Sequence, residues 1–419
     1  MKARHRVLGF LSLLSVITYL DRVCISVAGP RMQEALSLSP EQWGWVTGAF
    51  TLAYALFEMP SGSLGDRIGP RRVLTRIVLW WSAFTSLTGV VSGFIPLTLT
   101  RFAFGMGEAG AYPNIGVSIA RWFPLRDRTT AWGVVTMAAQ VGGALAPFLV
   151  VPIQQAFGWR ASFWAFGLLG VVWAATWYGW FRDSPREMAG VSEEEIAESG
   201  TVTAPHLAMP WAVAVRNGNL WALVGMACGV GYSMAFFQSW LGTYLVRARG
   251  FSEAGLLFAS IPFIVGAVAN LCGGFVGDAM VRKLGLRQGR RAMFLAGYGG
   301  ATVMLVIGVL LPEKYASLAA LSLAYGGITL GQPALMSVCL DMGGKYGGAI
   351  TGAMNTFAYL GAFLGSIAFG YLVASYGYAA PFIPMVILMA VGTLLGLLVN
   401  AEQPVIPDSP RLPQPTSIV

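Results

Sequence analysis

The sequence predicts an all-α membrane protein in which twelve transmembrane helices form two pseudo-symmetric six-helix bundles. Three observations predict this fold class: a composition suited to lipid, twelve apolar segments of membrane-spanning length, and features of the first half that recur in the second. Of the 419 residues, 56% are hydrophobic and only 11% are charged, and the mean hydropathy is +0.64. A soluble domain carries about 25% charged residues, so this chain has too little charge to cover a water-exposed surface of its size.

Twelve segments are long and apolar enough to cross a bilayer, which requires about 20 mostly apolar residues. The first segment follows a short basic stretch and has no small-x-small cleavage site, so we interpret it as a retained span rather than a signal peptide. The predicted spans are 7–28, 43–62, 73–94, 97–119, 130–152, 159–181, 219–241, 254–276, 292–311, 316–337, 347–373 and 381–400.

The spans divide the chain into four parts. Residues 1–181 form the expected N-terminal six-helix bundle, and residues 217–400 form the expected C-terminal six-helix bundle. Between them, 182–216 is the only long polar stretch, which predicts a cytoplasmic linker loop. Residues 401–419 are rich in proline and poor in apolar residues, which predicts a disordered cytoplasmic tail.

Basic residues set the expected orientation. An even number of spans places both termini on one side, where 20 of the 27 Lys and Arg residues lie, against five on the other side. By the positive-inside rule we expect both termini in the cytoplasm. The expected location is the cytoplasmic (inner) membrane of a bacterium. The same bias accounts for the formal net charge of +8, so no nucleic-acid partner is needed to explain it.

Glycine-containing features recur in the second half at matching places in the span order. Each repeat holds six spans, so both halves enter the membrane from the same side. The matching features are Gly62-x-x-x-Asp66 with Gly274-x-x-x-Asp278, Gly133 with Gly352, and Gly142 with Gly361.

The reactive side chains argue against an enzyme. The four cysteines lie in or beside apolar stretches without Cys-x-x-Cys spacing, which is typical of packing residues. The two histidines, His5 and His206, lie in the amino-terminal stretch and the polar linker. There is no nucleophile–base pair, metal cluster or phosphate loop in the sequence, so we expect no catalytic residues, no metal and no cofactor.

The loop after the second span carries the most specific motif, Gly62-Ser-Leu-Gly-Asp66-Arg67-Ile-Gly69-Pro-Arg71-Arg72. It resembles the loop signature of the major facilitator superfamily, Gly-x-x-x-Asp-Arg-x-Gly-x-Arg-Arg, at every fixed position. The resemblance implies a parallel duplication of six-helix halves that rock against each other. The simpler alternative is that the arginines only follow the positive-inside bias. In the family this loop acts as a conformational latch, here assigned to Gly62, Asp66, Arg67, Gly69, Arg71 and Arg72.

Charged residues near the centres of the spans occur only in the first half. Each costs about 2.5–3.5 kcal/mol at a helix centre on insertion scales. Arg101 and Glu108 are seven residues apart, which puts them on one helix face at two turns' separation, too far for a direct pair. Each charge therefore needs a partner on another helix or a water-filled cavity. The five residues are Asp21, Arg22, Glu58, Arg101 and Glu108.

These charges predict two kinds of role. We assign Arg22 to binding an anionic group of a substrate, and Asp21 and Glu108 to taking up protons that drive uptake. Arg101 and Glu58 are assigned to a charge network, although Glu58 lies one turn before the loop motif and can belong to the latch. The alternative is a purely structural ionic network, for example of Asp21 with Arg101, that orders the bundle.

Four further segments resemble a narrower family, the anion:cation symporter family of bacterial galactonate and hexuronate permeases and of the animal sialin and vesicular glutamate carriers. The likeness covers essentially the whole chain and is clearest in the first half. The segments are Ile17-Thr-Tyr19-Leu-Asp21-Arg22, Arg101-Phe-x-x-Gly-x-x-Glu108-Ala-x-x-Tyr112-Pro113, Gly158-Trp159-Arg160 and Trp180-Phe-Arg-Asp183-Ser-Pro185.

This narrower resemblance implies the same roles for the first-half charges, with Arg22 on a substrate carboxylate and Asp21 and Glu108 as the protonated pair. It also implies pocket positions at three polar residues, which could equally be polar residues that pack between helices. These are Tyr54, Gln140 and Asn355.

The expected function is proton-coupled import (symport) of a small organic anion, a sugar acid such as a hexonate or hexuronate, by rocker-switch alternating access. Residues 331–337 of the tenth span hold no aromatic side chain to lie against a sugar ring, so the sequence leaves the second half of the pocket undefined. The alternatives are a drug/proton antiporter of the same superfamily, which Arg22 beside Asp21 argues against, and a transport-inactive membrane sensor. We expect a monomer whose partners are the anion, protons and the lipid bilayer.

Overall fold

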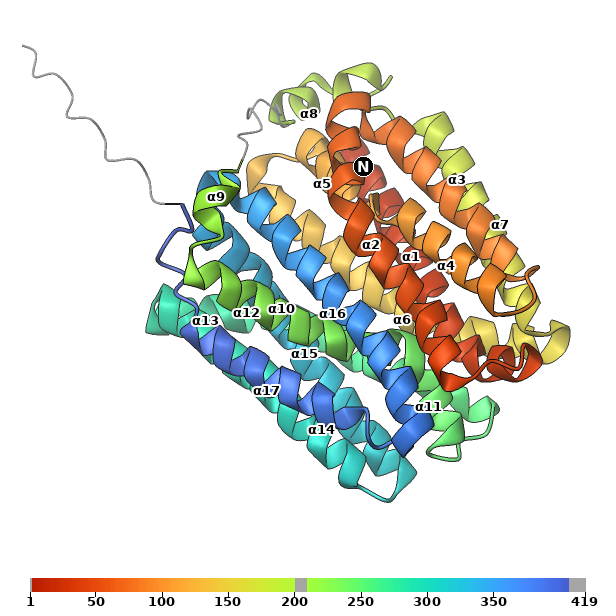
Figure 1. Ribbon diagram of the computed structural model, residues 1–419. Helices are drawn as coiled ribbons and strands as arrows, with labels where there is room; N and C mark the ends of the chain where they lie inside the picture. The colour runs from red at the N-terminus through yellow and green to blue at the C-terminus, as the bar shows by residue number, and fades with distance from the viewer. Residues whose placement is uncertain (1, 200–208, 407–419) are drawn as a thin grey trace, which may run out of the picture.

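The structure, a computed structural model, describes residues 2–199 and 209–406. The side chains of residues 62, 63, 65, 66 and 125 lie outside the description. The described residues form helices and turns, with no β-strand among them. In Figure 1 the helices of the first half, coloured red to yellow, gather beside those of the second half, coloured green to blue.

Seven helices make up the six spans predicted for the first half, because the fourth span is broken in two. Each predicted segment overlaps the corresponding helix or helix pair, although 73–94 runs six residues past the end of α3 and 159–181 runs one residue past the end of α7. The bounds are α1 (Ala3–Ala35), α2 (Pro40–Ile68), α3 (Pro70–Thr88), α4 (Phe94–Glu108), α5 (Ala111–Trp122), α6 (Arg128–Phe157) and α7 (Trp159–Trp180).

The second half has the same order of spans, two of which contain a π-helical turn. In the linker, α8 (Glu193–Glu198) and α9 (Trp211–Ala214) are short helices. The order of twelve predicted segments is therefore confirmed. The bounds are α10 (Gly218–Ala235), the π-turn η3 (Phe236–Trp240) and α11 (Leu241–Arg247); η4 (Ala254–Ser260) and α12 (Ile261–Leu284); α13 (Leu286–Phe294), the π-turn η5 (Leu295–Gly299) and α14 (Gly300–Leu310); α15 (Lys314–Gly343); α16 (Gly347–Tyr376); and α17 (Phe382–Leu398).

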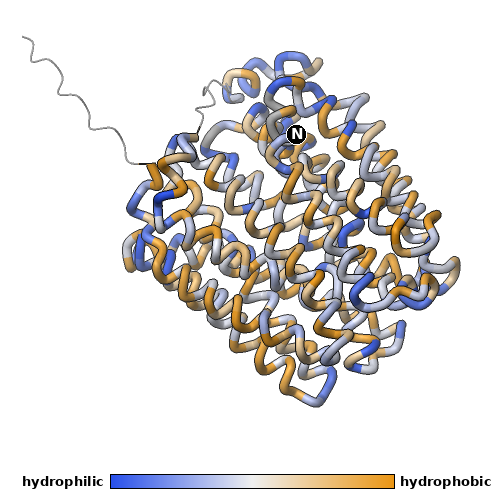
Figure 2. Tube along the Cα trace, in the orientation of Figure 1, coloured by the Kyte–Doolittle hydropathy of each residue, from blue (hydrophilic) through white to orange (hydrophobic). Residues whose placement is uncertain are grey.

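The outer surface of the helices is apolar. Side chains such as Phe275 and Leu310 are 72% and 75% exposed, and Figure 2 shows mostly hydrophobic residues along the lengths of the helices, with hydrophilic ones more frequent at their ends. Seven continuous helical stretches of the described chain are long and apolar enough to cross a membrane, and one of these, Lys314–Tyr376, contains both α15 and α16. Because a soluble protein rarely exposes apolar surface on this scale, the chain is an integral membrane protein.

Both described ends of the chain lie at the same end of the bundle, which we call the basic end; the opposite end, where α1 finishes and α2 begins, is the far end. At the basic end, α8 of the linker docks on the start of α1. The Glu195 carboxylate accepts hydrogen bonds from the backbone N–H groups of Ala3 and Arg4, at 3.1 and 2.7 Å, and so satisfies donors that a helix start leaves free. Hydrogen bonds from Lys2 and Arg4 lower the pKa of Glu198.

The start of the predicted disordered tail is packed against the basic end, which corrects the prediction for residues 401–406. Ala401 and Val405 are buried. The backbone N–H of Val405 donates to the Met342 carbonyl at 2.9 Å, and the Asn217 side chain donates to the Val405 carbonyl at 3.1 Å. The low apolar content of the tail predicted disorder, but composition takes no account of the neighbouring helix ends, against which two tail residues bury their side chains. The remainder of the predicted tail, 407–419, lies outside the described residues.

The two halves use the same close helix contact. Gly142 on α6 lies so near the Val16 carbonyl of α1 that a Cβ atom would overlap it, and Gly361 on α16 lies in the same way against the Cys228 carbonyl of α10. These are the first and fifth spans of each half. The predicted repeat therefore reflects matched packing, in which a small residue lets two membrane helices approach closely.

The halves meet mainly along α2 and α16, which run antiparallel side by side (Figure 1). Gly44 packs on the backbone of Ser366 near the far end, and Gly352 meets Met59 toward the basic end. At the far end, Arg31 of α1 also forms an ion pair with Glu253, which precedes η4. Contacts between the halves thus extend from the far end past the middle of the spans.

The glycine contact inside the first bundle predicts a position-specific loss of stability. We expect Gly142→Ala to lower the thermal unfolding midpoint of the purified protein, because the added methyl group must push α6 away from α1, at a cost of about 1–3 kcal/mol. The matched control is Gly133→Ala on the same helix, where a Cβ atom would meet nothing within 4 Å. Equal midpoints for the two variants would contradict the packing role of Gly142.

Candidate functional site

The break between α4 and α5 places Glu108 at a helix end inside the bundle. Pro113 has no backbone N–H, so it cannot bond to the Ala109 carbonyl, and its ring crowds that carbonyl. As a result α4 ends at Glu108 and α5 begins at Ala111. Glu108 is fully buried, at 0% exposure, and its carboxylate lies at the turn rather than along a continuous helix.

An ion pair between Arg22 and Glu108 forms the centre of the site. Arg22 lies past the middle of α1 and is 4% exposed. Its Nε donates to Glu108 Oε1 at 2.5 Å. Charge-assisted bonds of this kind are short and strong, and each partner lowers the cost of burying the other. The expectation that Glu108 needs a partner on another helix is met by Arg22.

Aromatic rings line the Arg22 guanidinium. Its Cζ atom lies 4.8 Å from the centre of the Tyr54 ring, 5.3 Å from Phe50 and 5.5 Å from Tyr19. A fourth ring, Tyr359 of α16, lies at 5.9 Å. Such rings attract a cation through their negative faces, so they hold the positive charge where lipid is excluded.

The second bundle reaches this cluster through Tyr359. Its hydroxyl oxygen accepts a hydrogen bond from Arg22 Nη1 at 3.1 Å, and its ring stacks on Tyr54 with centroids 4.0 Å apart. Arg22 therefore lies at the interface between the two bundles and not against lipid. One face of the interface presents a cation and the other a neutral hydroxyl.

Two further hydrogen bonds cross the interface, one of them beside Tyr359. Asn355, one helical turn away on α16, donates to Glu58 Oε1 at 3.0 Å. Tyr325 of α15 donates through its hydroxyl to Gln140 Oε1 of α6 at 3.1 Å. The predicted pocket residues Gln140 and Asn355 thus lie between the bundles, and Glu58, assigned to a charge network, bonds to one of them.

Asp21 and Arg101 are buried beside the central pair without joining it. Asp21 is 2% exposed, and neither carboxylate oxygen accepts a hydrogen bond from any described residue. Arg101 is 3% exposed and lies over the rings of Phe104 and Phe50, at 4.5 and 5.1 Å. No ion pair within 4.0 Å joins the two among the described residues, so the alternative of a direct Asp21–Arg101 pair is not what the structure shows.

Sequence reasoning missed both tyrosines of the second bundle. Tyr359 lies four residues after Asn355, and that spacing puts both side chains on one face of a helix, a signal that was present in the sequence. Tyr325 lies in the tenth span, one to two turns before the segment 331–337, which itself contains no aromatic residue. The second bundle therefore places two aromatic residues at the interface.

The loop motif is held within the first bundle. Gly69, at φ +94°, joins α2 to α3, and the Asp183 carboxylate accepts from the Arg71 backbone N–H at 2.8 Å. The Arg71 guanidinium donates to the Tyr178 carbonyl, while Arg67 and Arg72 are exposed. The side chains of Gly62 and Asp66 lie outside the described set. Asp183, from the motif after the sixth span, is the anion that caps α3 here.

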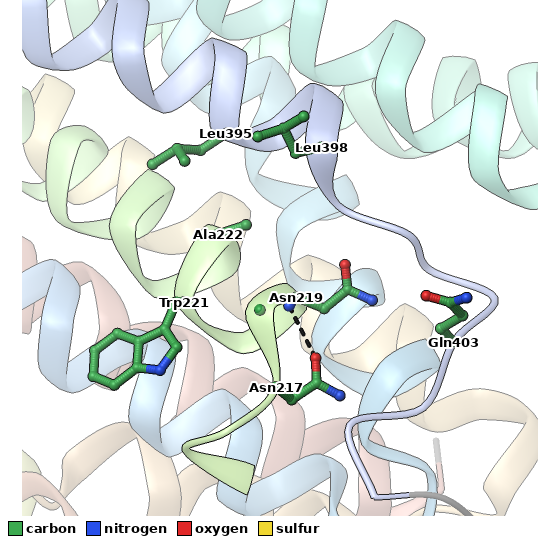
Figure 3. Close-up of a pocket in the computed structure, with 8 residues that line it drawn as sticks. Asn217, Asn219, Trp221, Ala222, Leu395, Leu398 and Gln403 are labelled. Atoms are coloured by element: carbon green, nitrogen blue, oxygen red, sulfur yellow. Dashed lines mark hydrogen bonds between the residues drawn. The ribbon is translucent and has the colours of Figure 1, made fainter.

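A hollow at the basic end is the wrong place for an anion-binding site. It has a volume of about 530 Å³ and is lined by Asn217, Asn219, Trp221 and Gln403 together with apolar side chains of α10 and α17. Figure 3 shows the two asparagines bonded to each other at the start of α10, with Gln403 on the segment that follows α17. This lining includes no charged side chain, and Arg22 lies elsewhere, between the bundles.

Comparison with known proteins agrees with this geometry. Residues 11–366 match the model of the Major Facilitator Superfamily. A probable sulfoacetate transporter from Cupriavidus necator is 33% identical over 408 residues, which cover 96% of this chain and 94% of the relative. A hexuronate transporter from Bacillus subtilis is 32% identical over 283 residues, covering 67% of this chain and 66% of the relative.

The solved structures support the same fold. A bacterial homologue of the human lysosomal transporter Spinster, in an inward-facing and occupied conformation, superposes with a TM-score of 0.77 at 20% identity, covering 94% of this chain and 96% of that one. The chain therefore belongs to the Major Facilitator Superfamily of membrane transporters, which are not enzymes, in agreement with the resemblance of its motifs to the anion:cation symporter family.

Proposed function

We propose that this protein is a proton-coupled importer of a small organic anion, a sugar acid such as a hexonate or hexuronate. The observation that carries the proposal is the position of Arg22, a buried cation at the interface between the bundles. Relatives named for the transport of sulfoacetate, hexuronate and galactarate or D-glucarate support an organic anion as the cargo.

The groups around Arg22 suit a polyhydroxylated acid. The guanidinium supplies charge and paired donors for a carboxylate, and its Nη2 has no partner among the described residues. Tyr54, Gln140 and Asn355, the proposed pocket residues, offer hydroxyl and amide groups that can bond to sugar hydroxyls. A cationic drug would instead meet the like charge of Arg22.

The balance of charges supports coupling to protons. Asp21, Glu58 and Glu108 are three buried carboxyl groups that face only two buried arginines, Arg22 and Arg101. With all five ionised the cluster is negative, which opposes the entry of an anion. Protonation of Asp21 and Glu108 reverses that balance, so we assign proton uptake to these two residues and a network role to Glu58 and Arg101.

The two-bundle interface supports alternating access. Its central contacts are hydrogen bonds to neutral groups and a ring stack, which rocking of the bundles can break and remake. We infer that the loop from Gly62 to Arg72 acts as the latch of this motion at the basic end, which we assign to the cytoplasm together with both termini. A single chain holds the complete cluster, so we propose a monomer.

Arg22 is expected to be required for anion binding. Hexonates or hexuronates should raise the thermal midpoint of the purified wild type, because a ligand that binds only the folded state stabilises it. Arg22→Ala should abolish this shift. Arg22→Ala also leaves Glu108 buried without its partner, so Arg22→Lys serves as the milder variant. Lysine keeps the positive charge but not the planar donor edge, and Arg22→Lys should bind the anion at least tenfold more weakly than the wild type.

The exposed Arg76→Ala controls for loss of a basic residue and should bind normally. Amine drugs are included in the same panel. Stabilisation by amines and not by acids would show that the cargo is a cation, and normal anion affinity in Arg22→Lys would remove Arg22 from the binding site.

Glu108→Gln is expected to separate binding from energy coupling. The amide keeps the shape of the side chain but cannot release a proton, so exchange of anion across proteoliposomes should continue while accumulation against a gradient falls to a ratio of about one. The exposed linker variant Glu194→Gln should accumulate like the wild type. Undiminished concentrative uptake by Glu108→Gln would contradict its coupling role.

Uptake is expected to follow the proton gradient. One proton moving down one pH unit provides about 1.4 kcal/mol, so an acidic exterior should raise the accumulation ratio by up to about tenfold per pH unit for each coupled proton. A protonophore should abolish accumulation. Uptake that is unaffected by external acidification and by the protonophore, but that follows a sodium gradient, would identify a different coupling ion.

A further inference from the structure

The donors of the Arg22 guanidinium are unequally occupied. Nε is held by Glu108 at 2.5 Å, Nη1 by the Tyr359 hydroxyl at 3.1 Å, and Nη2 by no described residue. The guanidinium is almost completely buried, so each of these donors has lost its contact with bulk water. An unpaired buried donor is costly, and a buried cation more so.

A carboxylate or sulfonate binds a guanidinium best with two parallel hydrogen bonds along one planar edge. Since Glu108 occupies Nε, the edge that remains for an incoming anion is formed by Nη1 and Nη2. Nη1 on that edge is the nitrogen that Tyr359 holds. Nη1 carries two N–H groups, and the Tyr359 hydroxyl and an anion on this edge therefore meet at the same nitrogen.

We propose that Tyr359 is a stand-in for the transported anion: its hydroxyl holds Arg22 in the empty protein, and the anionic group of the substrate displaces it. The inference rests on the proposed anion transport and adds to it a residue of the second bundle that sets affinity and turnover. Nothing in the motifs of the first half assigns such a role to Tyr359.

The exchange is favourable because the two acceptors differ in charge. A phenol oxygen is a neutral acceptor with one bond to Arg22, whereas a carboxylate forms two charge-assisted bonds, each about twice as strong as a neutral one. Tyr359 can yield, because it is only half-buried and the stack of its ring on Tyr54 does not depend on the hydroxyl bond to Arg22.

The position of Tyr359 on α16 gives the exchange a mechanical consequence. While its hydroxyl holds Arg22, the empty site is joined across the bundles, and the cation regains this partner each time rocking closes the interface. When the anion is bound, the anion supplies that partner. Tyr359 thus lowers anion affinity, while it helps the unloaded protein to return to the outward-open state.

The test is Tyr359→Phe, which removes the hydroxyl and keeps the ring that stacks on Tyr54. The loss of one competing hydrogen bond should tighten anion binding about fivefold, measured by calorimetry with the sugar acid or sulfonate that best stabilises the wild type. Net uptake into proteoliposomes should become several-fold slower, since the empty protein must return with Nη1 unpaired, while anion exchange should be little affected.

Tyr232→Phe is the matched control, because Tyr232 is a buried tyrosine of the second bundle whose hydroxyl has no hydrogen-bond partner in the described structure. It should leave both affinity and turnover unchanged. A merely structural role of Tyr359 would not raise affinity. Weaker binding by Tyr359→Phe would show that the hydroxyl donates to the anion, and unchanged binding would show that it does not compete; either result overturns the inference.

A ligand-free measurement keeps this test separate from the proposed function. In a double-mutant cycle of Arg22→Lys and Tyr359→Phe, both changes remove the same hydrogen bond between Arg22 and Tyr359. The decrease in thermal midpoint of the double variant should therefore be about 2 °C smaller than the sum of the two single decreases. Additive losses would show that the bond is not formed. If the Arg22–Tyr359 bond is confirmed but no organic anion binds the wild type, the proposed cargo is wrong. The proposed displacement of the Tyr359 hydroxyl by that cargo is then overturned as well.

Discussion

The ion pair between Arg22 and Glu108 constrains everything around it, because a charge inside a membrane protein needs a partner and shielding from lipid. The partner requires α1 and α4 to approach closely, and the Pro113 break ends α4 where the carboxylate can reach the guanidinium. The shielding comes from the rings of Tyr19, Phe50 and Tyr54 and from the facing bundle. A cation held in this way keeps donors available for a second acceptor, and that property makes the cluster a candidate transport site.

The two bundles share a scaffold but not their chemistry. Gly142 and Gly361 form equivalent close contacts with the first helix of each half, so the backbone arrangement follows the duplication. The central charges, in contrast, belong to the first half. The second half contributes neutral groups to the facing surface, those of Tyr325, Asn355 and Tyr359. Neutral contacts of this kind are weaker than ion pairs, which suits an interface that has to separate and close again while the charges remain inside one rigid bundle.

Much of the fold was predictable from local pattern. Hydropathy located all twelve spans, since a bilayer imposes the same length on every segment, and repeated glycines indicated the duplication. The prediction for the tail was wrong from 401 to 406, where Ala401 and Val405 are buried against the helix ends. A short segment with little apolar character carries no local sign of such docking, because the surface that receives it comes from α10 and α15.

The sequence by itself determined which residues of the first half carry charge in the membrane, since each such charge is too costly to occur without a role. Only the tertiary structure decided how they pair. Arg22 pairs with Glu108, 86 residues away in the sequence, and with Tyr359, 337 residues away. The packing of the helices leaves Asp21 without a hydrogen-bond partner among the described residues. Hydropathy depends on each segment alone, whereas the choice of partner depends on how the helices rotate and cross, so the facing tyrosines emerged only once the two bundles were packed together.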